Sequence, residues 1–494
     1  MKLLKTTLAL ALLQGLLACT TVGPDYRVPD AATIKNPTAS AAFVSANNPA
    51  VSIAPVPDDW WMLYDDPVLN DLVRQALTAN ASLRVASANL RRAVALAGEV
   101  DAEKGFHGSA DIAVKRAQES GEAYLLTEKL PVFNEGDVGF AISYDLDLFG
   151  KLARGEEAAH ANTEASLAAL DLARVNVVAQ TVRAYVQGCS ASHELAVAQH
   201  ELDLQNRSVD VTQRLANAGR GRSTDVLRAQ AQADLLRANL PRFQAEHDAA
   251  LFQLAVMVGK TPTEIVAAHI QCNIEPELHQ AIPVGDGAAL LKRRPDIREA
   301  ERQLASATAR IGVATAELYP DIVIGASAGF TGILEDIGHP ATERWGIGPL
   351  ISWRIPDNGS RARIHAAEAG ADGALAHFDG VVLNALKETE TALTLYTHDL
   401  DRNAALRAAR DKAQQVAKEN RQLYQSGRAP FLSSLDSDRT LANADAALAA
   451  SDSQIAMDQI NLFMALGGGW ETAAKQQTAN TASGVAAKSA AATH

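Results

Sequence analysis

The chain contains the same sequence pattern twice. Leu215–Arg220 resembles Leu423–Arg428, and Leu254–Gly259 resembles Leu462–Gly467, both at an offset of 208 residues. Three shorter matches keep the same order at offsets of 209, 213 and 214: Phe149–Lys151 with Asn358–Ser360, Phe106–His107 with Tyr319–Pro320, and Ser82–Arg84 with Asp296–Arg298. A duplication of about 200 residues argues against several unrelated cores. We therefore predict two repeats, 66–261 and 287–469, joined by an equatorial segment at 262–286.

Each repeat has the same predicted order of elements. A helical segment (67–104 or 287–318) precedes two strands, a very long helix, a glycine turn and a second long helix. The predicted strands are 108–117, 138–149, 321–331 and 345–355. The predicted long helices are 150–218, 222–258, 360–426 and 430–466. We expect Ser223 and Asp225 to cap the second helix, Pro241 to kink or break it, and Pro430 to lie in the first turn of the fourth.

The composition favours long, thin helices over wide cores. Hydrophobic residues make up 47% of the chain, but aromatic residues only 5%. Residues 150–218 contain no proline, and about 65 residues at 1.5 Å each form a helix of roughly 100 Å. The apolar stripe on this helix is narrow, which is typical of coiled coils.

The predicted strands alternate apolar and small or polar residues over a length that suits a tilted membrane strand. Asp145, Asp147 and Ser327 belong to the small and polar set, and we expect them to face a polar lumen. Four strands cannot close a barrel, and an open edge in lipid leaves unpaired backbone groups. The chain must therefore share strands with other copies, and at least eight strands are needed.

The N-terminus reads as an export signal. Lys2 and Lys5 precede an apolar run that ends at Ala18, so residues 1–18 are predicted to be a signal peptide. Leu16–Cys19 also resembles a lipobox, which makes Cys19 the lipidated first residue; the alternative is an ordinary signal peptide with a chance cysteine. Thr20 after Cys19 suggests the outer membrane. We expect residues 19–65 to form a lipid anchor with an extended strap, and the tail 470–494 to be disordered.

Several chemistries find little support. The net charge of −13 makes nucleic acid an improbable partner. No cofactor motif is present. The 12 histidines lack the paired i, i+4 spacing of a metal-binding helix, so no metal ligand is assigned. Gly325–Gly329 spells the serine-hydrolase G-x-S-x-G pattern around Ser327, but within an alternating segment where a strand-to-helix turn is required. Cys189 and Cys272 could pair; two unpaired buried thiols are the favoured prediction.

From Cys19 to Trp470 the chain resembles the TolC-like outer-membrane efflux factors, in particular their NodT/OprM-type lipoproteins. The segments that carry the resemblance are Trp60–Trp61, Asp66–Pro67, Asp145–Gly150, Arg293–Arg298, Leu432–Arg439 and Ala465–Trp470. The resemblance implies a mainly α protein with a transmembrane β-barrel: a homotrimer with a 12-stranded barrel, four strands per chain, and a periplasmic tunnel of 12 helices. It also implies a periplasmic adaptor protein and an inner-membrane pump, commonly of the resistance-nodulation-division type. The protein would then be a passive duct for small toxic molecules, without enzymatic activity or cofactor.

The same resemblance suggests a periplasmic gate near Gly219 and Gly427. Leu432, Asp436 and Arg439 match constriction positions of the OprM-like branch. Asp225 and Tyr424 match positions that link neighbouring coils, whereas the linking arginine aligns with Ala429, next to Arg428. A carboxylate repeated around an axis attracts cations, and arginine–carboxylate pairs can hold a closed state. The alternative is that Asp436 and Arg439 form an i, i+3 pair on a solvated helix face.

Three rival functions remain at this stage. A structural coiled-coil envelope lipoprotein would show no conductance and no detergent-stable trimer, and the four alternating segments argue against it. An envelope hydrolase would use Ser327. A channel of the same fold could serve type I protein secretion or metal-ion efflux.

Overall fold

The computed structural model describes residues 21–355 and 358–468. The chain divides into two compact units. Within the described residues, unit 1 contains 21–30, 89–167 and 299–378, and unit 2 contains 31–88, 168–298 and 379–468. Among the described helices, none is both long and apolar enough to cross a membrane.

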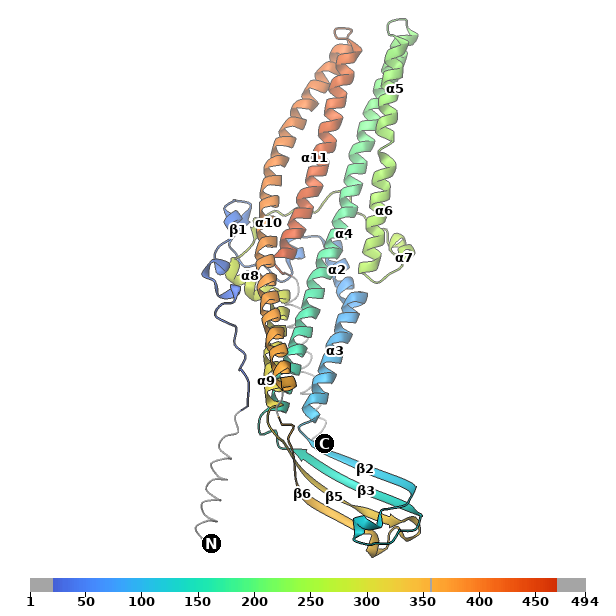
Figure 1. Ribbon diagram of the computed structural model, residues 1–494. Helices are drawn as coiled ribbons and strands as arrows, with labels where there is room; N and C mark the ends of the chain where they lie inside the picture. Colours follow the sequence, from blue (N-terminus) through green and yellow to red (C-terminus); the bar gives the residue numbers. More distant parts are fainter. Residues whose placement is uncertain (1–20, 356–357, 469–494) are drawn as a thin grey trace, which may run out of the picture. The chain divides into compact units, whose positions relative to one another are not determined.

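Unit 1 contains a four-stranded antiparallel sheet (Figure 1). Its strands are β2 (Phe106–Ala117), β3 (Phe133–Asp145), β5 (Asp321–Ile333) and β6 (Glu343–Ser352), in the order β2-β3-β5-β6. The register pairs Phe140 with Ala328, which in turn pairs with Trp345, and this brings the apolar set of each strand onto one face. The predicted alternation of the strands is therefore confirmed.

The predicted strand 138–149 was wrong at both ends, because β3 begins at Phe133 and ends at Asp145. Leu146 and Leu148 continue the alternation in sequence only. The carboxylate of Asp147 accepts hydrogen bonds from the backbone N–H groups of Leu152 and Ala153, at 2.9 and 2.8 Å. Asp147 is thus a capping residue of the next helix and not a lumen-facing strand position. The fourth strand also ends early, at Ser352.

The N-terminal strap is fixed to unit 1 just after the sheet. The backbone N–H of Val22 donates to the carbonyl of Phe149 at 3.1 Å. The Arg154 guanidinium donates to the carbonyls of Val22 and Gly23, at 3.1 and 3.2 Å, and pairs with Asp25 at 2.7 Å. One buried arginine therefore holds residues 22–25 at the start of a long helix. Cys19 lies outside the described residues.

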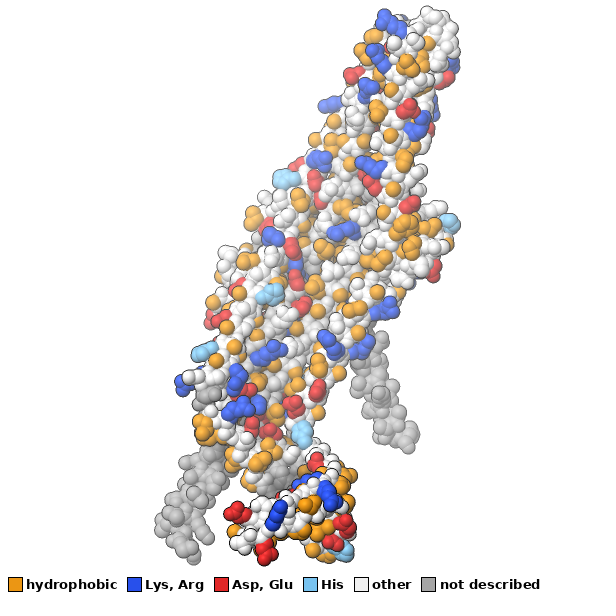
Figure 2. Space-filling model, turned by 45° about the vertical axis from the view of Figure 1, so that its right-hand side comes forward, with side chains coloured by type: hydrophobic (Ala, Val, Ile, Leu, Met, Phe, Trp, Pro, Cys, Tyr) orange, Lys and Arg blue, Asp and Glu red, His pale blue; other side chains and the backbone are white. Residues whose placement is uncertain are grey.

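The long helices match the predicted ones closely, and four of them are α4 (Lys151–Asn217), α6 (Leu240–Met257), α10 (Asn358–Gln425) and α11 (Phe431–Ala465). The predicted helix 222–258 is broken into α5 (Ser223–Arg237) and α6, with Pro241 in the first turn of α6, which confirms the effect of Pro241. The prediction that Ser223 and Asp225 cap this helix was wrong. The N-cap of α5 is Arg222, whose side chain makes no capping hydrogen bond. Pro430 is the N-cap of α11, one residue before its first turn. Figure 2 shows charged side chains of both signs scattered among hydrophobic and other side chains.

The two predicted helical segments before the strands are each divided in two. Residues 67–104 form α2 (Pro67–Ala79) and α3 (Ala81–Ala102), and residues 287–318 form α8 (Gly287–Arg293) and α9 (Pro295–Ala316). Asn80 separates the first pair, and its side chain accepts from the N–H groups of Ser82 and Leu83, at 2.8 and 3.3 Å. Pro295 separates the second pair, because the residue before a proline is biased toward extended backbone.

The remaining elements of unit 2 are short. They include β1 (Val51–Ser52), which pairs in parallel with β4 (Ile282–Pro283), and the helix α7 (Pro262–Ala267). The 3-10 helices in this part of the chain are η1 (Thr33–Lys35), η2 (Pro37–Ser40), η3 (Val44–Ala46) and η4 (Trp60–Tyr64). The loops of the sheet in unit 1 contain η5 (Gly121–Tyr124), η6 (Leu334–Asp336) and η7 (Pro340–Thr342).

Two arginines of the Arg293–Arg298 segment donate hydrogen bonds to backbone carbonyls in the strap and at the end of α11. Arg294 donates to the carbonyl of Ala465 at 2.8 Å and pairs with Glu388 at 2.9 Å. Arg293 donates to the carbonyl of Pro57 at 3.2 Å. Nearby, the buried Trp60 ring stacks on Phe463 with 4.6 Å between ring centroids. The strap, α10 and α11 are thus tied together within unit 2.

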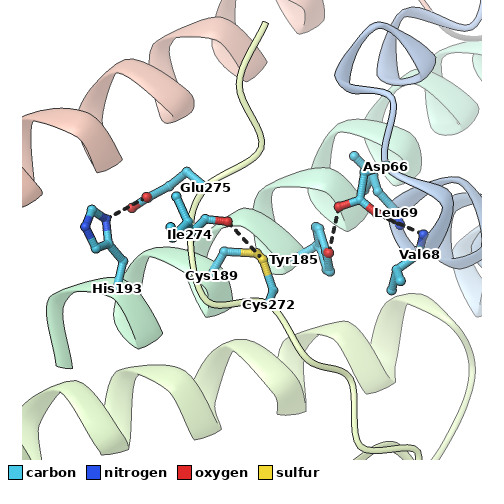
Figure 3. The surroundings of a disulfide bond; sticks show 9 residues. All are labelled: Asp66, Val68, Leu69, Tyr185, Cys189, His193, Cys272, Ile274 and Glu275. Atoms are coloured by element: carbon cyan, nitrogen blue, oxygen red, sulfur yellow. Dashed lines mark hydrogen bonds and ion pairs between the residues drawn. A yellow bond between two sulfur atoms is a disulfide. The ribbon is translucent and has the colours of Figure 1, made fainter. Parts of the chain in front are cut away.

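Cys189 on α4 and Cys272, in the segment after α7, form a disulfide. The prediction of two unpaired thiols was therefore wrong. The same segment makes a second contact with α4, because Nδ1 of His193 lies 2.9 Å from Oε2 of Glu275 (Figure 3). Together the two contacts attach the 262–286 segment to α4.

Candidate functional site

The two predicted glycine turns both lie in unit 2 and appear at the same end of its helices (Figure 1). Gly219 and Gly427 have φ angles of +69° and +72°, which glycine adopts without the steric cost of a Cβ. The N–H of Arg220 donates to the carbonyl of Leu215, and that of Arg428 to Leu423, each at 2.8 Å. These are the bonds of a Schellman helix ending. The two repeats therefore end their long helices by the same mechanism.

A small apolar cluster lies next to these turns. Ala229, Phe431 and Leu435 are buried together, and Tyr424 packs against them. The rings of Tyr424 and Phe431 have centroids 5.4 Å apart. Tyr424 is therefore a packed side chain within one chain, whereas Leu432, on the same turn as Phe431, is 59% exposed. Of the predicted gate residues, Leu432 thus has the free apolar surface that a constriction requires.

Among the described residues, Asp436 and Arg439 do not form the i, i+3 ion pair that was the alternative to a gate. Arg439 on α11 donates from Nε to Oε1 of Gln232 on α5, at 2.8 Å. Asp436 is exposed, and among the described residues no ion pair joins it to Arg439. Asp225 instead lies 3.5 Å from Arg228 on its own helix. Asp436, Leu432 and the exposed Arg428 are thus available to a partner outside this chain.

Further charged residues on the long helices were missed by sequence reasoning. Arg421 on α10 pairs with Asp438 on α11 at 2.7 Å, and burial raises the pKa of Asp438 although this ion pair opposes the shift. Glu201 on α4 is 7% exposed; burial, followed by a hydrogen bond with Asp445, raises its pKa to about 8. Arg439 and Gln232 are 207 residues apart, close to the repeat offset of 208, so they occupy nearly equivalent positions in the two repeats. This equivalence could have suggested that α5 contacts α11.

The sheet positions Asp145 and Ser327 lie on the face opposite the apolar one. Ser327 pairs with Ala141 and Gly346, in the middle of β5, which excludes the strand-to-helix turn of a hydrolase nucleophile. On the same face Asp137 pairs with Arg344 at 2.6 Å and accepts from Thr331 at 2.8 Å. This face of unit 1 is therefore polar and carries ordered charges.

A family model and several known proteins match most of the chain. The family model described as outer membrane efflux protein matches residues 72–260 and 288–468. This chain belongs to that family. It is 30% identical to nodulation protein T of Rhizobium leguminosarum bv. viciae, over 98% of this chain and 97% of the relative. It is 25% identical to the antibiotic efflux pump outer membrane protein ArpC of Pseudomonas putida, over 94% of this chain and 96% of the relative.

A solved outer-membrane channel has the same fold. The structure of the channel OprN superimposes with a TM-score of 0.85 at 34% identity, over 91% of this chain and all of that chain. The fold is therefore that of the TolC-like channels, and this member of the efflux family is an outer-membrane efflux channel. The described α5, α10 and α11 residues around the two turns are its candidate gate.

Proposed function

We propose that this chain assembles as a homotrimer in which three four-stranded sheets form one 12-stranded barrel, with the long helices forming a periplasmic tunnel. The sheet of unit 1 carries the proposal. Among the described residues its edge strands β2 and β6 have no outer partner, and on its apolar face Ile112 and Trp345 are 78% and 81% exposed. Unpaired backbone groups in lipid cost several kcal/mol each. Neighbouring copies would pair both edges, and lipid would cover the apolar face.

A lipid anchor at Cys19 is the second part of the proposal. Cys19 precedes Thr21 by two residues, and two residues of extended chain reach about 7 Å. Because Val22 is bonded to Phe149, just after the sheet, acyl chains on Cys19 would lie near the end of the proposed barrel. Several acyl chains would hold the chain firmly at a membrane, since each buried CH₂ contributes about 0.8 kcal/mol.

The gate is the third part. Three copies would bring three Asp436 carboxylates and three Leu432 side chains around one axis, and a ring of carboxylates favours cations. Asp436 supports this role because it is exposed and has no ion pair with Arg439 among the described residues. Asp225, Tyr424 and Arg428 would contribute to contacts between neighbouring hairpins.

Membership of the family supports a proposal for the partners and the cargo. A periplasmic adaptor and an inner-membrane pump, of the resistance-nodulation-division type, would supply the substrate and the energy. The name of ArpC describes an antibiotic efflux pump protein, and we infer that small toxic molecules are the cargo here as well. The channel itself would be passive and would need no cofactor.

Planar-bilayer recording of the purified full-length protein tests this function. We expect discrete conductance steps with a preference for cations, and loss of that preference in Asp436→Asn. The matched control is Asp411→Asn, an exposed carboxylate on α10. Absence of steps would contradict the channel, whereas steps with unchanged selectivity in Asp436→Asn would contradict only the gate.

A further inference from the structure

Unit 1 contains a cluster of side chains that the channel function does not use. Asp101 at the end of α3 and Glu156 and His160 on α4 offer three ligand atoms that all lie within 4.8 Å of one another. Nε2 of His160 is 3.2 Å from Oδ1 of Asp101 and 3.7 Å from Oε1 of Glu156. Two donors on one tetrahedral zinc ion lie about 3.3 Å apart, given metal–ligand distances of roughly 2.0–2.1 Å. The two distances from His160 are therefore close to the donor spacing of a coordination sphere.

The two helices that supply the ligands are fixed on both sides of the cluster. The hydroxyl of Thr163 on α4 donates to the carbonyl of Ala93 on α3 at 3.3 Å. Toward the sheet, a Cβ at Gly155 would lie 3.8 Å from Cγ1 of Val100, so the helices are in contact there as well. Glu156 and His160 are four residues apart and share one face of α4. The helices that supply the ligands are thus in contact on both sides of the cluster.

A lysine orients one of the carboxylates. Lys104 forms an ion pair with Oε2 of Glu156, which leaves Oε1 facing His160. Partners of this kind set the orientation of metal-binding carboxylates. The side chains of His160 and Asp101 are 52% and 42% exposed, which gives an ion a path from solvent.

We propose that Asp101, Glu156 and His160 bind a divalent transition-metal ion with water completing the coordination. One imidazole and two carboxylates suit Zn²⁺, Co²⁺, Ni²⁺ or Cu²⁺, whereas soft monovalent ions prefer sulfur ligands. The bound ion links the end of α3 to the beginning of α4, on either side of strands β2 and β3 in sequence. This role is independent of the gate and of the trimer.

The sequence pattern alone did not indicate this site, because it contains only one histidine and its third ligand comes from another helix. His365 provides a matched control. It lies near the beginning of α10, as His160 does on α4, and its Nδ1 is 3.0 Å from Glu368. Among the described residues it belongs to no group of three metal-binding side chains.

The test is calorimetric titration of the untagged full-length protein in detergent with Zn²⁺, with Mg²⁺ as a competitor. We expect one saturable site per chain, binding weakened at least about 10-fold in His160→Ala, weakened also in Asp101→Asn, and unchanged in His365→Ala. Thermal unfolding of each variant without metal shows whether it is folded, and Zn²⁺ should raise the unfolding temperature of the wild type but not of His160→Ala.

Three results would overturn the site. They are no saturable binding by the wild-type protein, equal losses in His160→Ala and His365→Ala, and displacement of Zn²⁺ by an equal concentration of Mg²⁺. The last result would mean that the imidazole is not a ligand, because Mg²⁺ prefers oxygen donors.

Discussion

Cys189 on α4 is covalently bonded to Cys272, and the bond closes a loop across 83 residues. A cross-link of this span stabilises the folded chain by about 4–5 kcal/mol in the chain-entropy account. We expect Cys189→Ser, Cys272→Ser and the double variant to lower the midpoint of urea unfolding by the same amount, because each removes the same bond. Circular dichroism of the helices measures this midpoint. A double variant much less stable than either single variant would contradict a single shared bond.

The His193–Glu275 contact should make the attachment of the same segment depend on pH. The hydrogen bond with Glu275 raises the pKa of His193. Burial is the largest influence on the pKa of Glu275 and would raise it, but the hydrogen bond and charge of His193, together with further hydrogen bonds to the carboxylate, lower it on balance. The contribution of His193 to the free energy of unfolding is complete below about pH 6.5 and is lost as the pH rises through its raised pKa. The contribution of Glu275 is complete above about pH 4.3 and is lost as the pH falls through its lowered pKa.

The contact is therefore strongest between about pH 4.3 and 6.5. We expect His193→Gln to cost about 2 kcal/mol at pH 6, the usual contribution of a hydrogen bond to a charged group, and less at pH 9. Urea unfolding at the two pH values measures the difference. An equal loss at both would mean that the charge of His193 contributes nothing.

Glu201 should destabilise the helical unit at high pH. Its pKa in the folded chain, about 8, exceeds the ordinary value of about 4.3. The contribution of Glu201 to the free energy of unfolding is therefore complete below about pH 4 and is lost as the pH rises toward 8. We expect Glu201→Gln to raise the thermal unfolding temperature at pH 9 and to change it little at pH 4. Glu419→Gln, at an exposed position of α10, is the control. A variant with the same shift at both pH values would contradict a buried protonated carboxyl.

The gate predicts a change in conductance. Asp436→Ala combined with Arg439→Ala should increase the single-channel conductance, because it shortens two charged side chains at the proposed constriction and removes the Arg439 bond to Gln232. The control is Asp234→Ala with Arg237→Ala, an exposed i, i+3 pair on α5. Equal conductance in both double variants and the wild type would remove Asp436 and Arg439 from the gate.

Local patterns predicted the elements better than they predicted contacts. The alternation around Phe140 and Trp345 identified the apolar face, because side chains of a strand alternate strictly, and Pro241 marked a real helix break. Asp147 was misassigned because the leucines beside it continue the alternation, although its carboxylate caps α4. The disulfide could not be predicted, since the distance between Cys189 and Cys272 depends on the path of the 262–286 segment. The partner of Arg439 was missed for a similar reason, because Gln232 lies on another helix.

The central claim, that each sheet is one third of a shared barrel, is tested most directly by crosslinking strand β2 of one chain to strand β6 of the next. Ser109→Cys and Gly346→Cys lie on the polar face, at the two edges of the sheet. A bismaleimide that tolerates a shift in register should convert the purified double variant into a closed covalent trimer, while each single variant, which still contains Cys19, should give none. Only uncrosslinked chains in the double variant, or a ladder extending beyond three chains, would contradict the shared barrel.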